Sequence, residues 1–145
     1  MQSIASNNYK LLPLFIPMTN FRIFSTSSGK QVLGGKSAKN NEELIAQIEP
    51  TEIVLHTAMP GSPFVNIKGK ATKKDIKESA TFCAKHSQDW RDNKNDVVIH
   101  VFRSSDIYKN EKMKAGTFGI KKFKTLKVRK EEILKFEKEI NQEHS

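Results

Sequence analysis

The segment at residues 53–67 constrains the fold most, because it has the pattern of two strands joined by a tight turn. Residues 53–55 and 64–67 are short apolar runs rich in β-branched side chains. Pro60-Gly61-Ser62 lies between them. Proline presets φ at one central position of a turn, and glycine accepts a positive φ at the next. The pattern therefore predicts an antiparallel strand pair, with His56 at the end of the first strand.

Two further elements are predicted before this strand pair. Residues 21–33 hold two apolar runs on either side of a Ser/Gly cluster at residues 25–30, which indicates a hairpin. Asn40 or Asn41 is then predicted to cap a short helix that Pro50 ends.

Helices and strands follow in mixed order after the strand pair. Thr72 and Asp75 have the spacing of a capping box and precede an apolar-faced helix over residues 73–87. Residues 97–102 predict a central strand, residues 118–128 one or two strands, and residues 130–141 a final helix. Because these elements do not alternate regularly, the predicted fold class is α+β. We expect a mixed, mostly antiparallel sheet packed with two or three helices, one of them at the C-terminus.

The length allows a single domain, which we assign to residues 18–145, since two domains would each have a marginal core. Residues 1–17 contain no acid, and their apolar run is too short to span a bilayer. Three interpretations stay open for this leader. It is disordered or not translated, with Met18 as the start; it packs on the domain as a strand or strap; or it is a targeting segment.

The charge of the chain is strongly positive and unevenly distributed. The sequence has 25 Lys and Arg against 16 Asp and Glu, a net charge of +9. Residues 64–130 hold eighteen basic and seven acidic side chains, between a nearly neutral start and an acidic end. Such a concentration of positive charge predicts a polyanionic partner.

The basic side chains form two clusters. The first surrounds the start of the helix predicted after Thr72, where free amide groups also favour phosphate. The second lies in residues 112–130, which contain eight basic side chains and no acid, and we expect one face of the strands there to be almost wholly cationic. We predict phosphate binding; a merely solvated surface is the alternative, because Asp75 and Glu78 lie within the first cluster. The predicted RNA-binding lysines are Lys68, Lys70, Lys73, Lys74, Lys77, Lys112, Lys114, Lys121, Lys122 and Lys124.

Aromatic side chains divide into predicted core and predicted surface groups. Tyr108 and Phe118 lie in or beside a lysine-containing loop and are the candidates for stacking on RNA bases. Core packing is predicted for the four phenylalanines at apolar periodic positions, which are Phe64, Phe82, Phe102 and Phe123. The single cysteine, Cys83, is predicted to be a buried structural thiol, which suits a reducing compartment.

The ordered set of motifs from residue 20 to residue 129 resembles the NFACT-R family, the RNA-binding module of NFACT proteins, here as a stand-alone domain. The motifs are Gly34-Gly35, the Asn-Glu-Glu helix start, the strand that ends in His56, the Pro-Gly-Ser turn, and a Lys-x-Gly loop at Lys114. Two positions depart from the family pattern. This chain has Pro63 where many members have His, and Lys36 where they have Arg. The second change replaces a bidentate fork with a point charge, which weakens the expectation of base or phosphate contacts there.

The resemblance implies an RNA-binding role in the cytoplasm, with tRNA or ribosomal RNA as the partner. Members of the family act in ribosome-associated quality control and engage the large ribosomal subunit, so a related role, or one in tRNA handling, is implied here. The turn that contains His56, Gly61 and Ser62 would contribute local recognition of RNA shape. A structural role for His56, with a hydrogen-bonded imidazole, remains the other interpretation.

Catalysis, a cofactor and a bound metal are not predicted, because no metal-ligand spacing, phosphate-binding loop or nucleophile motif is present. Two other classes of function stay open. The first is an RNA-processing or RNA-modifying enzyme that uses His56 with His100 or Asp106 as acid and base. The second is a protein-interaction module that binds an acidic ribosomal protein. No membrane association is predicted, and the oligomeric state does not follow from the sequence.

Overall fold

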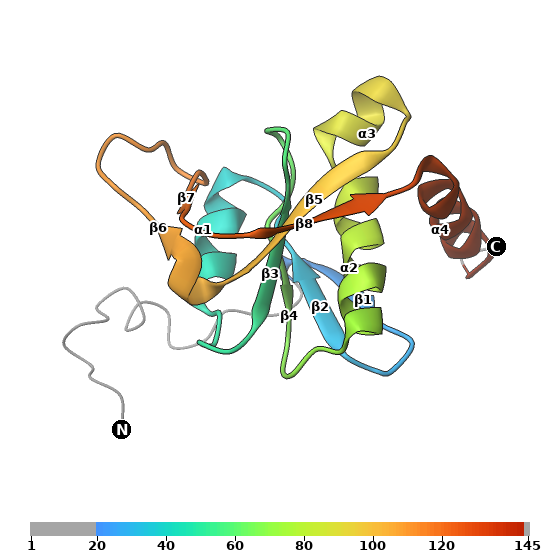
Figure 1. Cartoon of the computed structure of the whole chain (residues 1–145), viewed down its shortest axis with the longest axis horizontal. Helices are drawn as coiled ribbons and strands as arrows, with labels where there is room; N and C mark the ends of the chain where they lie inside the picture. Colours follow the sequence, from blue (N-terminus) through green and yellow to red (C-terminus); the bar gives the residue numbers. More distant parts are fainter. Residues whose placement is uncertain (1–19, 144–145) are drawn as a thin grey trace.

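A six-stranded sheet forms the centre of the computed structural model, which describes residues 20–143 (Figure 1). The predictions made for residues 1–17 lie outside this range. The strand order is β1-β2-β4-β3-β5-β8, and every neighbouring pair is antiparallel. A separate two-stranded sheet joins β6 and β7. The strands are β1 (Arg22–Ser25), β2 (Gln31–Gly34), β3 (Ile53–Thr57), β4 (Val65–Ile67), β5 (Val97–Arg103), β6 (Ile107–Tyr108), β7 (Gly119–Ile120) and β8 (Lys124–Val128).

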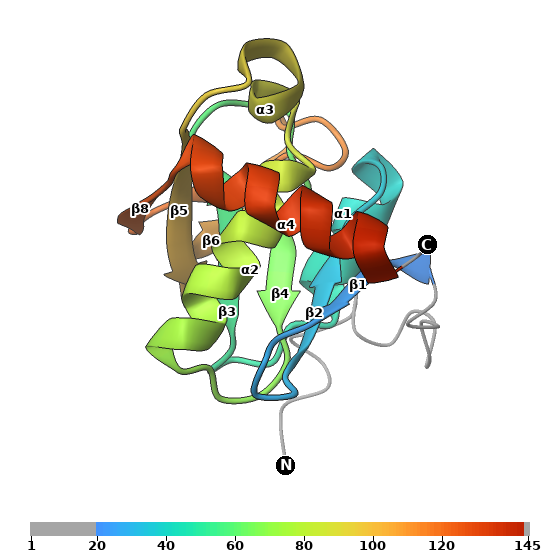
Figure 2. The same cartoon turned by 90° about the vertical axis from the view of Figure 1, so that its right-hand side faces the viewer.

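Helices cover both faces of the large sheet. Helices α2 (Lys73–Lys85) and α4 (Lys130–Glu143) lie on one face, and the short α3 (Gln88–Asn93) lies at the end of α2 (Figures 1 and 2). Helix α1 (Ala38–Ala46) and the β6–β7 hairpin lie on the opposite face (Figure 1). A 3₁₀ turn at Ser104–Asp106 leads from β5 into β6. The α+β class predicted from the sequence is therefore confirmed.

The first of two apolar clusters lies between the sheet and α2. Ala80, Cys83 and Ala84 of α2 are fully buried against strand residues that include Leu55 and Ile99. Their small side chains allow the helix axis to approach the sheet closely. Burial also raises the pKa of the Cys83 thiol to about 12, so this cysteine is a structural thiol, as predicted.

The second cluster lies on the opposite face, beneath α1 and the β6–β7 hairpin. Leu44 of α1 packs there with Val54 of β3, Phe102 of β5 and Phe64, which directly precedes β4. Because successive side chains of a strand point to opposite faces, β3 contributes Val54 to this cluster and Leu55 to the first. The interior strands are thus buried on both sides.

The start of α2 is built as the sequence predicted. The Thr72 hydroxyl accepts a hydrogen bond from the Asp75 amide, and the Asp75 carboxylate accepts one from the Thr72 amide. The same carboxylate accepts a hydrogen bond from the Ser28 hydroxyl, at 2.6 Å, at the tip of the β1–β2 hairpin. These hydrogen bonds, with that of Ser28 the strongest cause, hold the pKa of Asp75 well below its usual value.

Three local predictions were wrong. Helix α1 begins at Ala38 with Ser37 as its N-cap, rather than at Asn40 or Asn41, because the Ser37 hydroxyl accepts the Asn40 amide. The helix predicted over residues 73–87 ends at Lys85, and α3 follows it with Ser87 as N-cap. The lysines of β8 do not share one face: pairing with β5 places Lys124 on the side of α2 and Lys127 on the opposite side.

A buried polar network closes the end of the sheet where β3 begins. Glu52 is 4 % exposed and accepts hydrogen bonds from the Lys68 ammonium, at 2.8 Å, and from the Gly69 amide, at 2.9 Å. The Asn66 side chain is fully buried and donates to Glu52 and to the Ile53 carbonyl. Burial opposes ionisation of Glu52. The hydrogen bonds from the Lys68 ammonium and from the backbone amides of Gly69 and Glu49 outweigh this effect and lower the pKa of Glu52.

We expect Glu52→Gln to lower the free energy of unfolding by about 2 kcal/mol, because it leaves the Lys68 ammonium without its anionic partner. Urea denaturation at neutral pH measures the change. Glu49→Gln is the matched control, since only the backbone of Glu49 takes part in this network. Equal stability of the two variants would contradict the role assigned to Glu52.

Candidate nucleic-acid interface

The turn between β3 and β4 is held by hydrogen bonds inside the protein. The Ser62 hydroxyl accepts the Thr57 amide at 3.1 Å, and the Gly61 carbonyl accepts the Gln88 amide at 2.7 Å. Gly61 has φ +87°, and a Cβ atom there would lie 2.9 Å from the Cβ of Gln88. Both the backbone conformation and the close approach to α3 therefore require glycine at this position. Gly61 is exposed at the surface of this turn, whereas the Ser62 hydroxyl is engaged in a hydrogen bond within the turn.

His56 points to the face of the sheet that α1 covers in part. Its Nδ1 donates a hydrogen bond to the Thr57 carbonyl at 2.8 Å, and its ring lies 4.4 Å from that of Phe64. The paired residue on β5 is His100, so the two imidazoles are cross-strand neighbours. Burial lowers the pKa of His56 first, and the nearby His100 lowers it further. His56 is therefore neutral near pH 7.

The lysines around the start of α2 separate into one internal and several surface side chains. Lys68 is bound by Glu52 and by the Gln47 side chain, both at 2.8 Å, so its ammonium is committed to the buried network. The exposed lysines of this cluster are Lys70, Lys73, Lys74 and Lys77.

The acids within this cluster contact the β1–β2 hairpin. The Glu78 carboxylate accepts hydrogen bonds from the Ser27 amide and hydroxyl at 2.7 and 2.6 Å, and Asp75 binds Ser28. Free amides at the start of α2 were predicted to favour phosphate. The capping box occupies two of these amides, those of Thr72 and Asp75, and phosphate binding there stays a prediction.

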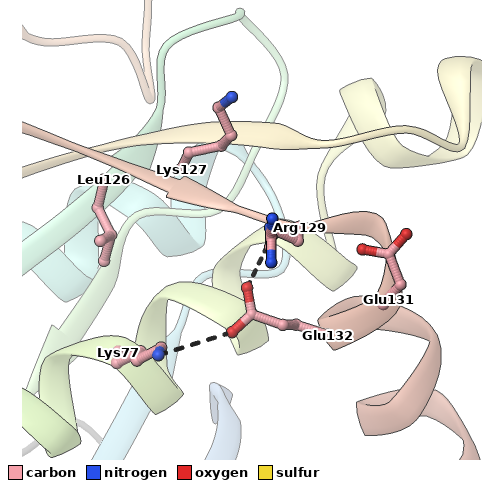
Figure 3. A pocket seen from close by; sticks show the side chains of 6 residues that line it. All are labelled: Lys77, Leu126, Lys127, Arg129, Glu131 and Glu132. Carbon is pink, nitrogen blue, oxygen red and sulfur yellow. Dashed lines mark hydrogen bonds and ion pairs between the residues drawn. The ribbon is translucent and has the colours of Figure 1, made fainter.

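The second basic cluster lies on β8 and the loop before it. Lys121, Lys122, Lys124 and Lys127 are all exposed, and β8 is an edge strand that pairs only with β5. The two clusters meet at a surface depression between β8, α2 and α4 (Figure 3). Within the depression Lys77 lies 4.0 Å from Glu132. The residues that line it are Lys77, Leu126, Lys127, Arg129, Glu131 and Glu132.

A third set of lysines lies in the loop between β6 and β7. Glu42 of α1 holds this loop, because its carboxylate accepts the Lys109 ammonium and the Gly116 amide, each at 2.8 Å. Gly116 has φ +80°, and a Cβ atom there would lie 2.5 Å from the Cα of Ala38. The loop is thus tied closely to α1, and it presents the exposed side chains of Lys112 and Lys114 to solvent.

The aromatic side chains differ in exposure from the sequence prediction. Phe118 packs edge-on against Phe64, at 5.4 Å between ring centres, and Lys109 covers it at 4.6 Å. The Tyr108 ring lies against Gly119, where a Cβ atom would come within 2.0 Å of it, yet the side chain is 42 % exposed. Tyr108 therefore remains a candidate for base stacking, whereas Phe118 belongs to the second cluster.

Phe123 was predicted to lie in the core, and this prediction was wrong. Its side chain is 46 % exposed and stacks on the ring of His100, with 3.8 Å between ring centres. Apolar periodicity does not reveal such a residue, because Phe123 precedes β8 and is not part of the strand register.

A small α+β domain with exposed lysines along one sheet edge and around one helix start has the features of a basic nucleic-acid-binding module. The family model described as NFACT protein RNA binding domain matches residues 20–122. The chain therefore belongs to this family, as its motifs indicated, and membership supports an RNA-binding role. The matched segment ends before Phe123, so β8 and α4 lie beyond it.

Among solved structures, the C-terminal part of the fibronectin/fibrinogen-binding protein from Streptococcus suis is similar, with a TM-score of 0.69 and 21 % sequence identity. The match covers 80 % of this chain and 48 % of that one, and it establishes a shared fold. No curated protein matches the chain. In residues 20–143, no helix is both long and apolar enough to cross a membrane.

His86, at the C-terminus of α2, lies in a positively charged environment. Its ring packs edge-on against Phe82, at 5.0 Å between ring centres. Burial, followed by the positive charges of Arg22, Lys85 and Arg91, lowers its pKa to about 4. The unfolded chain binds a proton at this histidine below about pH 6.5, while the folded chain does so only near pH 4. Folding is therefore destabilised as the pH falls between these values.

We expect His86→Gln to lose less stability than the wild type when the pH falls from about 7 to about 5, because the variant lacks the group that the unfolded state protonates. Urea denaturation at each pH measures the difference. Arg91→Gln should reduce the pH dependence in part, since it removes one of the charges that lower the pKa. Identical pH dependence in all three proteins would refute this assignment.

Proposed function

We propose that this protein binds tRNA or ribosomal RNA, mainly through contacts between its exposed lysines and RNA phosphates. The observation that carries the proposal is the match of residues 20–122 to the NFACT RNA-binding domain. The lysine distribution supports it independently, because exposed basic side chains at the start of α2 and on β8 meet at one depression, and the β6–β7 loop carries two more. The proposed phosphate-binding side chains are Lys70, Lys73, Lys74, Lys77, Lys112, Lys114, Lys121, Lys122 and Lys124.

The cellular setting that we propose is the cytoplasm, in ribosome-associated quality control or tRNA handling, with the large ribosomal subunit as the site of action. The support is the family to which the chain belongs. The turn at Gly61 and Ser62, next to His56, is proposed to fit a local feature of RNA shape, since its backbone is fixed by α3.

We also propose that the protein binds RNA without chemical turnover. The residues considered as acid and base have structural contacts of their own. His56 donates Nδ1–H to the Thr57 carbonyl, and the Asp106 carboxylate accepts the Arg103 amide at 3.1 Å. RNA incubated with the purified protein should be recovered unmodified and of full length, as measured by gel electrophoresis and mass spectrometry. Turnover that His56→Ala abolishes, with binding retained, would establish the enzyme alternative.

The affinity for tRNA should fall steeply with salt, with a log–log slope of about −4 to −7 if six to eight phosphates are contacted. The double variant Lys121→Glu/Lys124→Glu should weaken tRNA binding and make the slope shallower, because both side chains are exposed. The pair Lys135→Glu/Lys138→Glu is the matched control, since it makes the same change of charge on α4. Fluorescence anisotropy at two salt concentrations measures both effects.

Three results of this titration would count against the proposal. No binding to tRNA or to an unstructured RNA near physiological salt would exclude RNA as the partner. Equal weakening by both double variants would mean that net charge, and not the β8 cluster, determines affinity. Capture of a ribosomal protein that survives ribonuclease treatment, without RNA binding, would favour the protein-interaction module.

A further inference from the structure

Phe123 is an exposed aromatic ring that stacks on a second ring. The His100 imidazole lies 3.8 Å from it, with an angle of 20° between the ring planes. One face of Phe123 is thus covered by His100, and the 46 % exposure of the side chain leaves the opposite face and the edges to solvent. A partly exposed aromatic face that is backed by a second ring from β5 is available to stack on a planar ligand.

The residues around this ring form a row across three strands. His56, His100 and Thr125 are paired in register on β3, β5 and β8. They lie on the face of the sheet opposite α2, beside the second apolar cluster. Burial lowers the pKa of His100, so its ring is neutral near pH 7 and stacks on Phe123 without bringing a charge to the surface.

The charge around the ring is positive. Lys121, Lys122, Lys124 and Lys127 lie within four residues of Phe123 and are exposed. None of these four has an ion pair with another of the residues 20–143. Acidic side chains are absent from residues 112–130. Phe123 therefore has an aromatic face and is flanked in the sequence by lysines without anionic partners among the described residues. This combination complements a nucleotide, because the base can stack on the ring and the anionic phosphate can bind a lysine.

We propose that Phe123, supported by His100, is a stacking platform for one unpaired RNA base, and that Lys122 and Lys127 bind the phosphates next to it; Lys127 lies on the same face of β8 as His100. This inference rests on the RNA binding proposed above and narrows the ligand to RNA with unpaired bases. Both faces of a base inside a duplex are already stacked, so only an unpaired base, in a loop, a bulge or a single-stranded overhang, can cover Phe123. The module therefore distinguishes folded RNA with unpaired nucleotides from continuous duplex.

The test compares two RNAs with the same number of phosphates, a hairpin with a single-stranded loop and a blunt duplex. Phe123→Ala and Phe123→Leu should weaken binding to the hairpin about 5- to 150-fold, the range expected for one stacked base. Binding to the duplex should change less than about 2-fold, and the salt slope should stay the same, because no charge is removed. Leu134→Ala is the control, since Leu134 on α4 is equally exposed, at 46 %.

Phe123→Trp gives a direct readout of stacking. The only natural tryptophan, Trp90, is 1 % exposed and provides a constant background. Fluorescence of the new tryptophan should be quenched by the hairpin and not by the duplex, with hairpin affinity preserved. Wild-type affinity of Phe123→Ala for the hairpin, or unquenched Phe123→Trp in its complex, would overturn the inference and leave the proposed function intact. Failure of the wild type to bind either RNA would overturn both.

Discussion

The antiparallel pairing of β3 with β5 is the constraint on which the remaining structure depends. Its register places Leu55 beside Val101 and Val54 beside Phe102, so each apolar cluster receives side chains from both strands. A shift of one residue would exchange the two faces and move apolar side chains away from α2. The same register pairs His56 with His100, and these imidazoles therefore meet on the face that no large helix covers completely.

Several acidic side chains of this basic protein accept hydrogen bonds from other parts of the domain. Glu52 binds Lys68, Glu42 holds the β6–β7 loop, and Asp75 and Glu78 bind the tip of the β1–β2 hairpin. Each of these carboxylates accepts hydrogen bonds that fix a loop or a strand end, which is a larger contribution to stability than an exposed ion pair makes. The surface lysines are consequently left with few anionic partners within the described part of the chain, and a positive potential remains at the sheet edge and at the start of α2.

The main elements of this fold could be predicted because their signals are local. The Pro-Gly turn, the capping box at Thr72 and Asp75, and the small-residue stripe of α2 each depend on residues that are close in sequence. Local signals did not distinguish Ser37 from the neighbouring asparagines as the N-cap of α1. Asn41 is needed elsewhere, since its side chain accepts the amide of Phe64 on the far side of the cluster. That requirement appears only when the two segments are folded together.

The candidate site illustrates the same limit. The sequence predicted that Lys68 and Lys77 belong to one cluster. In the structure Lys68, which follows β4, binds Glu52, whereas Lys77 on α2 is exposed. Phe123 was assigned to the core because it has an apolar periodic position, although it precedes the strand that would have buried it. Whether a lysine or a phenylalanine is available to a ligand depends on partners such as Glu52 and His100, which lie far away in the sequence.

Phosphate and base contacts would make different contributions to RNA recognition on this surface. Lysine contacts give affinity that depends on salt and is indifferent to sequence, whereas stacking on Phe123 is insensitive to salt and requires an unpaired base. The two kinds of group alternate along the chain, since Phe123 lies between Lys122 and Lys124. On the proposed model, one short segment at the sheet edge would bind both the RNA backbone and an unpaired base, and this segment lies beyond the residues that match the family model.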